Sequence, residues 1–125
     1  MKVYVERAAL PDELIELAEM GGRGSNAWMA YMEYEEDGEY VYRIKAEIPL
    51  HVARRLLSRK TAELLDILKE NSSLGISEIA EKLGRSPPNV HRDLELLEAY
   101  NLVVYKRKGR KRIPRLNIER IIVVP

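Results

Sequence analysis

The stretch from Ser86 to Ile113 constrains the fold most strongly, because its helix and turn signals follow one another in a fixed order. Ser86 is a favourable N-cap, and Pro87 suits the first position of a helix. Since the two prolines after Ser86 lack N–H groups, its hydroxyl is expected to cap the Asn89 amide. Apolar residues then recur at helical spacing, at Val90, Leu94 and Leu97. We therefore predict a helix over residues 87–100.

A strand and a basic turn follow this helix. Asn101 suits the left-handed conformation that ends a helix, and Val103-Val104-Tyr105 is typical of a strand. Lys108-Gly109-Arg110 predicts the tip of a hairpin, from which the chain returns through Arg112-Ile113. Residues 106–112 contain six cations in seven positions. The pattern predicts an exposed helix followed by a basic wing.

Charge is divided unequally along the chain, although the net charge is only +1. Residues 1–57 contain seven Lys and Arg against eleven Asp and Glu, a balance of −4. Residues 58–125 contain fourteen against nine, a balance of +5. A basic run alone usually indicates only a solvated surface. Here the run lies at a hairpin tip beside a helix, where it would meet nucleic-acid phosphates.

The composition argues against several classes of protein. With no Cys there is no disulfide framework, thiolate metal site or Cys nucleophile, which favours a cytoplasmic protein. The apolar runs are too short to cross a membrane, and the N-terminus lacks the apolar stretch of a signal peptide. His51 and His91 lie far apart with no evident nucleophile or carboxylate pair, so we do not expect an enzyme. The 33% of charged residues and the lack of Gln favour a heat-adapted source.

The N-terminal residues predict a small α+β unit. Lys2–Glu6 alternates like a strand, Pro11 opens a helix, and Gly21–Ser25 is a connection without the ending of a phosphate-binding loop. Ala27–Tyr34 and Tyr40–Ile48 both alternate, which predicts an antiparallel hairpin. A loop of odd length would unite its tyrosines on one face. That face could pack on its own helix, on a second copy or around a ligand.

The middle of the chain predicts further helices and a boundary. An apolar stripe from Leu50 to Leu68 fits either one helix or two with a break at Ser58. Ser77 is the expected cap of a helix over 78–83, which Gly84 ends. Only Arg85 separates Gly84 from the cap of the next helix, which is the spacing of a helix-turn-helix. We therefore predict an α+β fold with an N-terminal unit, 1–57, and a C-terminal winged helix-turn-helix domain, 58–125.

Residues 57–118 carry a resemblance to a known group of proteins. Ser77–Gly84, Ser86–Leu94, and Leu97-Glu98 with Asn101-Leu102-Val103 resemble the winged-helix transcriptional regulators of the ArsR and MarR type. The phrase Asn89-Val90-His91-Arg92-Asp93-Leu94, with Arg112 and Pro114, is similar to predicted archaeal and bacterial regulators. Asn101 stands where such proteins commonly have Gly, and the Cys and His ligands of metal-sensing ArsR members are lacking. The resemblance implies DNA binding and no metal.

The expected interface consists of the surface of helix 87–100 and the wing. Its helix residues are Ser86, Pro88, Asn89, His91, Arg92 and Glu95. Its wing residues are Lys106, Arg107, Lys108, Arg110, Lys111 and Arg112. Asn89 and His91 would lie near base edges, Arg92 on a base or a phosphate, and the wing on the backbone or minor groove. Glu95 would repel phosphate, so it either reads cytosine or indicates a tilted helix.

The expected function is a sequence-specific transcriptional regulator, a repressor or an antitoxin-like protein, that binds double-stranded DNA as a homodimer. The dimer contact could come from the N-terminal unit, from the helix beginning at Leu50 or from a C-terminal strand over 119–124. The alternative is a winged helix that binds RNA or docks onto a protein. We predict no cofactor. A small-molecule effector, for which there is no direct support, would be sought at the tyrosine-lined face.

Overall fold

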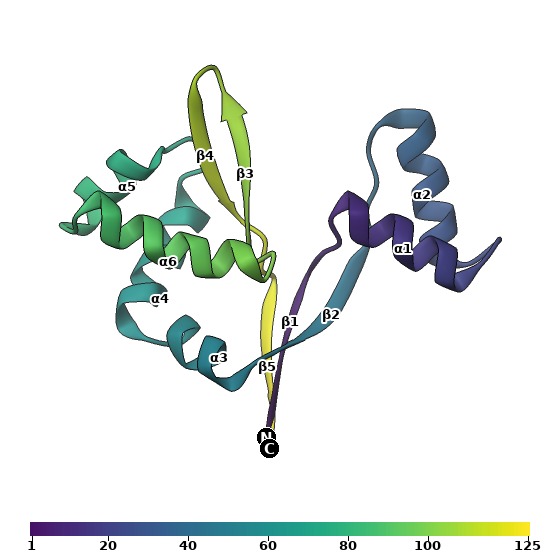
Figure 1. Ribbon diagram of the computed structural model, residues 1–125, viewed down its shortest axis with the longest axis horizontal. Helices are drawn as coiled ribbons and strands as arrows, with labels where there is room; N and C mark the ends of the chain where they lie inside the picture. Colours follow the sequence, from purple (N-terminus) through teal and green to yellow (C-terminus); the bar gives the residue numbers. More distant parts are fainter.

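The computed structural model describes residues 1–125 and has a mixed α/β fold with six helices and two small antiparallel sheets. The helices are α1 (Pro11–Gly21), α2 (Asn26–Asp37), α3 (Leu50–Leu56), α4 (Arg59–Glu70), α5 (Ile76–Leu83) and α6 (Pro87–Ala99). The strands are β1 (Lys2–Ala8), β2 (Arg43–Ile48), β3 (Val103–Lys108), β4 (Lys111–Leu116) and β5 (Arg120–Val124). Figure 1 shows α3 to α6 on one side of the three-stranded sheet and α1 and α2 on the other.

The three-stranded sheet brings the two ends of the chain together. Its order is β2-β1-β5, and both pairs are antiparallel. Val3 lies opposite Ile48 on one side and opposite Val123 on the other. The strand predicted over Lys2–Glu6 is confirmed and extends to Ala8. The C-terminal strand, one of the expected places for a dimer contact, pairs along one edge with β1 of its own chain.

The hairpin predicted over Ala27–Tyr34 and Tyr40–Ile48 is wrong, because the first of these segments lies in α2. The Ser25 hydroxyl caps this helix by accepting from the Trp28 N–H at 3.2 Å. Residues at helical spacing are wholly or partly buried, namely Ala27, Ala30, Tyr31 and Tyr34. Ala, Met and Glu favour a helix, and Gly38 ends it at φ 73°. The second segment keeps only β2, which pairs with β1.

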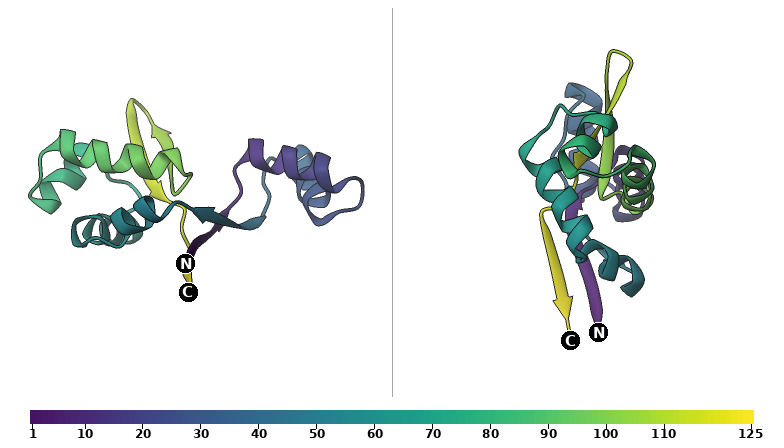
Figure 2. Two further views of the ribbon diagram at one scale, coloured as in Figure 1. Left: turned by 60° about the horizontal axis from the view of Figure 1, so that its bottom comes forward. Right: turned by 90° about the vertical axis from the view of Figure 1, so that its left-hand side faces the viewer.

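The hairpin of α1 and α2, here called the arm (residues 11–37), projects away from the rest of the molecule (Figure 2). The two helices pack mainly on each other. Their core consists of Leu14, Ala18, Ala27 and Ala30. The Glu13 carboxylate ties the arm to β1 by accepting from the two Nη groups of Arg7 at 2.7 and 2.8 Å. The arm therefore has its own small core and a polar attachment.

α3 and α4 are separate helices with a break at Ser58. The Ser58 hydroxyl accepts from the Thr61 N–H at 3.4 Å, as an N-cap does. The same hydroxyl donates to the Arg55 carbonyl oxygen at 2.7 Å. One side chain therefore ends α3 and begins α4. Of the two alternatives that the sequence left open, the structure has the broken helix.

α5 and α6 follow each other through a tight turn, and two of the predicted caps differ. α5 begins after Gly75, whose N–H donates to the Glu78 carboxylate at 3.4 Å, so Ser77 lies inside the helix rather than capping it. Ser86 precedes α6 as predicted. Its backbone carbonyl, however, accepts from the Asn89 N–H at 3.1 Å, so the hydroxyl does not cap that amide. The helix ends at Ala99, close to the predicted end.

The hairpin of β3 and β4 has the turn that the sequence predicts. Asn101 adopts a left-handed φ of 59° after α6. Lys108 lies opposite Lys111, which leaves Gly109 and Arg110 as a two-residue turn. Gly109 has a φ of 65°, a conformation in which a side chain would be strained. The basic residues are therefore held at the tip of a tight hairpin.

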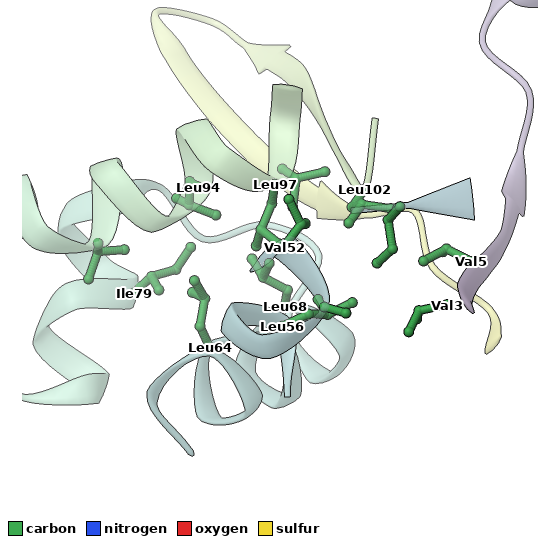
Figure 3. Close-up of a cluster of buried hydrophobic side chains, with 14 of the residues drawn as sticks. Val3, Val5, Val52, Leu56, Leu64, Leu68, Ile79, Leu94, Leu97 and Leu102 are labelled. Atoms are coloured by element: carbon green, nitrogen blue, oxygen red, sulfur yellow. The ribbon is translucent and has the colours of Figure 1, made fainter. Parts of the chain in front are cut away.

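A core of 15 buried residues joins the three-stranded sheet to the C-terminal helices. Figure 3 shows Leu56 and Leu64 packed toward Ile79 and the α6 residues Leu94 and Leu97, with Val3 and Val5 of β1 at one end. This core crosses the predicted boundary between residues 57 and 58. The strands of the predicted N-terminal unit thus share the core of the C-terminal helices, and the arm has a separate one.

Candidate nucleic-acid interface

α6 buries one face and exposes the other. Val90, Leu94 and Leu97 are buried in the core. The residues predicted to contact DNA lie outside: Ser86, Pro88, Asn89, Arg92 and Glu95 are exposed, and His91 is half-buried. The helical spacing thus places the predicted residues on one open surface.

His91 and Glu95 lie one turn apart on this surface and pair with each other. The distance from His91 Nε2 to Glu95 Oε1 is 3.0 Å. Such pairs between positions i and i+4 stabilise a helix modestly. Glu95 was expected to repel phosphate. Its carboxylate accepts a hydrogen bond from His91 whenever His91 carries a proton on Nε2.

The tip of the β3–β4 hairpin presents cations of two kinds. Lys111 pairs with Glu78 of α5 at 3.0 Å, and Arg112 pairs with Glu98 of α6 at 3.4 Å. These two pairs fasten the hairpin to the helices. The four remaining cations are all exposed and make no ion pair; they are Lys106, Arg107, Lys108 and Arg110. Figure 2 shows the tip of the hairpin extending beyond the helices.

Tyr105 supports Arg112 at the base of the hairpin. The guanidinium carbon of Arg112 lies 4.0 Å from the centre of the Tyr105 ring, a cation–π contact. Burial raises the pKa of Tyr105, and the charge of Glu98 raises it further, so the ring stays neutral. Arg112 is thus held by Glu98 and Tyr105, which makes it less available to phosphate than the four unpaired cations.

A second group of cations, which sequence reasoning missed in part, lies at the other end of α6. A polar hollow of about 330 Å³ opens between the α3–α4 junction and the first turn of α6. No apolar residue lines it. Its cations are Arg55, Lys60, Arg85 and Arg92, of which only Arg92 belongs to the predicted interface. Three segments of the chain thus bring positive charge to one place.

Asp93 organises this hollow from the buried side. Its Oδ1 lies 2.7 Å from Arg55 Nη2, and its Oδ2 lies 2.7 Å from Arg85 Nη2. The Asp93 side chain is only 9% exposed. A buried carboxylate requires charged or hydrogen-bonding partners, so Asp93 beside the apolar stripe of α6 was the signal that could have indicated nearby cations.

Sequence comparison assigns this chain to a family. A model of the HVO_A0114 family matches residues 56–123, which is more than half of the chain. The chain belongs to the HVO_A0114 family. No curated protein matches it. The part that matches the HVO_A0114 family contains α4 to α6, β3 and β4, whereas the arm lies outside it.

A larger hollow, of about 960 Å³, lies between this HVO_A0114-family region, the base of the arm and the segments on either side of the arm. Tyr34, Tyr40 and Tyr42 line one side, and Lys106 and Arg115 of the hairpin line another. The tyrosines predicted for an effector site thus do gather around a hollow, although from α2 and the following loop rather than from a sheet. The effector itself stays a prediction.

Neither a metal cluster nor a membrane-spanning helix is found in this member of the HVO_A0114 family. No three His, Asp or Glu side chains are grouped so that they could hold a metal ion. Every helix is too short or too polar to cross a lipid bilayer. The polar surfaces of α6, the hairpin tip and the 330 Å³ hollow are the features that a function must explain.

Proposed function

We propose that this protein is a sequence-specific DNA-binding transcriptional regulator, acting as a repressor, in which residues 58–125 contain a winged helix-turn-helix. α6 would be the recognition helix and the β3–β4 hairpin the wing. One observation carries the proposal: the open polar face of α6 and four unpaired cations belong to one unit, fastened together by the pair of Arg112 with Glu98. That combination suits a ligand with base edges and regularly spaced phosphates.

The reading of bases is assigned to the N-terminal half of α6. Asn89 is exposed, and an Asn side chain can form two hydrogen bonds with adenine in the major groove. Arg92, about one turn further along the helix, could bind guanine or a phosphate. The pair of His91 with Glu95 leaves carboxylate acceptor capacity for a cytosine amino group. These residues would determine which sequence is preferred.

The wing would supply affinity that does not depend on sequence. If Lys106, Arg107, Lys108 and Arg110 each meet one phosphate, the wing alone contributes a slope of about −3.6 to log K against log salt concentration. Binding should therefore weaken steeply with salt. Since one recognition helix reads few base pairs, we propose a homodimer on a pseudo-palindromic site. A complex with two chains per site, measured by analytical ultracentrifugation, is expected.

The proposal is tested by selecting preferred sites from random duplex DNA and titrating the best site at two salt concentrations. Asn89→Ala should cost about 1–3 kcal/mol on that site and reduce the preference for one base position. If the wild type has no preferred duplex and Asn89→Ala changes nothing, the regulator proposal fails. That result would favour the alternative of RNA binding or protein docking.

The wing is tested separately with Lys108→Ala plus Arg110→Ala. This double variant should weaken binding to all duplexes alike and make the salt slope shallower by about 1.8. Lys2→Ala plus Lys69→Ala is the matched control, because it removes the same charge from exposed positions outside the interface. Equal losses in both double variants would show an effect of net charge alone and would contradict the assigned role of the wing.

A further inference from the structure

The polar hollow between the α3–α4 junction and α6 has the properties of an anion site. It contains four cations and a single acidic residue, Asp93, so its charge is about +3. Lys60 and Arg92 form no ion pair, and Arg55 and Arg85 share Asp93 between them. The internal pairing therefore leaves most of the positive charge without a partner.

Arg85 has an unsatisfied donor next to the hollow. Its side chain is 16% exposed, and its Nη2 reaches Asp93 at 2.7 Å. Its Nη1 is buried and has no hydrogen-bond acceptor. A buried donor without an acceptor is costly, and native structures contain few of them. Because Nη1 is closed off from solvent, it would reach an oxyanion in the hollow only through a movement of the Arg85 side chain.

Two helix N-termini add to the positive potential. Ser58 and Thr61, in the first turn of α4, line the hollow together with Asn89 of the first turn of α6. The N-terminal end of a helix carries partial positive charge and favours anions, phosphate groups in particular. Four cationic side chains and two such ends converge on a space of about 330 Å³.

From these observations we infer that the hollow binds a phosphate group, and that in a complex with DNA this group is a backbone phosphodiester. Arginine guanidinium groups match the several oxygens of phosphate through paired hydrogen bonds. Asn89 and Arg92 line the hollow and also lie on the open face of α6. A duplex on that face would therefore bring a phosphate to the hollow.

The length of α6 supports this placement. A helix of 13 residues is about 20 Å long, whereas the major groove is roughly 12 Å wide. The two ends of α6 would therefore reach the two phosphate walls of the groove. The C-terminal half meets the hairpin through Glu98 and Arg112, and the N-terminal end meets the hollow. In this arrangement the hollow fixes the register of the helix on the duplex. This part of the inference rests on the proposed function.

Lys60→Ala in the full chain tests the hollow, with Lys69→Ala as its matched control. Both lysines are exposed residues of α4 without an ion pair, and only Lys60 lines the hollow. Lys60→Ala should weaken binding to every duplex roughly fivefold to tenfold at about 0.1 M salt and make the salt slope shallower by about 0.9. Lys69→Ala should change neither. If Lys60→Ala and Lys69→Ala bind DNA equally well, while Lys108→Ala plus Arg110→Ala still makes the salt slope shallower, the hollow does not bind phosphate. The regulator proposal would then remain.

Titration with inorganic phosphate, followed by backbone amide NMR without DNA, separates the two sources of the phosphate group. Shifts at Ser58, Thr61 and Asn89 that Lys60→Ala abolishes and Lys69→Ala preserves would show that the hollow also accepts free phosphate. Absence of shifts together with a loss of slope in Lys60→Ala would assign it to the DNA backbone alone. If the wild type binds no duplex, the proposed function fails. The NMR shifts with inorganic phosphate then decide alone: their presence would support phosphate binding in the hollow, and their absence would overturn it.

Discussion

The arm and the body (residues 50–116) carry charges of equal size and opposite sign. The arm has eight acidic residues against one basic residue, a balance of −7. The body has fifteen basic residues against eight acidic ones, a balance of +7. The net charge of +1 thus conceals two oppositely charged regions. Division of the sequence at residue 57 understates this difference, because it counts Arg54 and Arg55 of α3 with the acidic half.

The two regions also differ in what holds them together. Most of the 15-residue core lies in the body, whereas the arm has four buried residues, three of them alanines. Alanine buries little apolar surface, so the arm gains little stability from its core. The arm also exposes apolar side chains, at Ile15, Met20, Met29 and Met32. The positively charged body is therefore attracted to a polyanion, whereas the acidic arm is repelled by it.

Loss of a core leucine should affect the body and the arm differently, and this is the largest effect that we expect. Leu94→Ala should lower the free energy of unfolding by about 3–5 kcal/mol, because this fully buried side chain leaves a cavity in the body. Leu14→Ala removes an equally buried side chain from the arm. It should melt the arm and leave the body folded. Urea unfolding followed by circular dichroism reports the whole chain, and Trp28, the single tryptophan, reports the arm.

A single unfolding transition shared by the arm and the body would contradict this expectation. If Leu14→Ala lowered the midpoint seen by circular dichroism as much as Leu94→Ala does, the arm would belong to the cooperative unit of the body. Coincident shifts of the Trp28 signal and of circular dichroism in the wild type and in both variants would likewise indicate a single cooperative unit. Separate transitions, with the Trp28 signal lost first, are expected.

The sequence predicts the body better than the arm, and the reason lies in particular residues. Gly84, Asn101 and Gly109 all have positive φ, and their positions mark element ends that few other residues could form. In α2, by contrast, Trp28 to Tyr34 fits the period of a strand as well as that of a helix. The Ser25 cap and the packing of α2 against α1 favour the helix. The packing against α1 is a tertiary contact, which local sequence patterns do not contain.

The candidate interface likewise has one part that the sequence predicts and one part that it does not. The hairpin cations and the open face of α6 are local features, so charge and helical spacing were sufficient to predict them. The hollow is assembled from Arg55, Lys60, Arg85 and Arg92, which span 38 positions of the sequence and meet only because α3, α4 and α6 share a core. No local pattern joins residues at such separations.

Removal of the Asp93 charge should have a smaller effect than loss of a core side chain. Asp93→Asn raises the balance of the body from +7 to +8 and replaces the carboxylate that Arg55 and Arg85 share with a neutral amide, which has one acceptor oxygen instead of two. We expect a loss of about 1–3 kcal/mol in the free energy of unfolding, together with tighter binding to all duplexes. Asp66→Asn is the control, since Asp66 is exposed and makes no ion pair. Equal stability of the two variants would show that Asp93 does not organise the hollow.

The smallest expected effect concerns the attachment of the arm. Hydrogen bonds from Arg7 hold the pKa of Glu13 below its usual range. A lowered pKa stabilises the folded state above the unfolded value, about 4.3, and this contribution is lost as the pH falls through the folded value. The Trp28 transition should therefore be constant from about pH 7 to 5 and shift to lower urea at more acidic pH. Glu13→Gln should remove that shift, whereas Glu16→Gln, at an exposed position, should retain it.

The sign of this pH dependence decides between two electrostatic effects in the arm. Repulsion among the excess negative charges of the arm would diminish on protonation, so acid would stabilise the helices. Loss of the Glu13 pair with Arg7 acts in the opposite direction. An arm that becomes more stable toward about pH 4 in the wild type would mean that self-repulsion dominates. An arm that weakens, and does so only when Glu13 is present, would place its stability in this one polar attachment to β1.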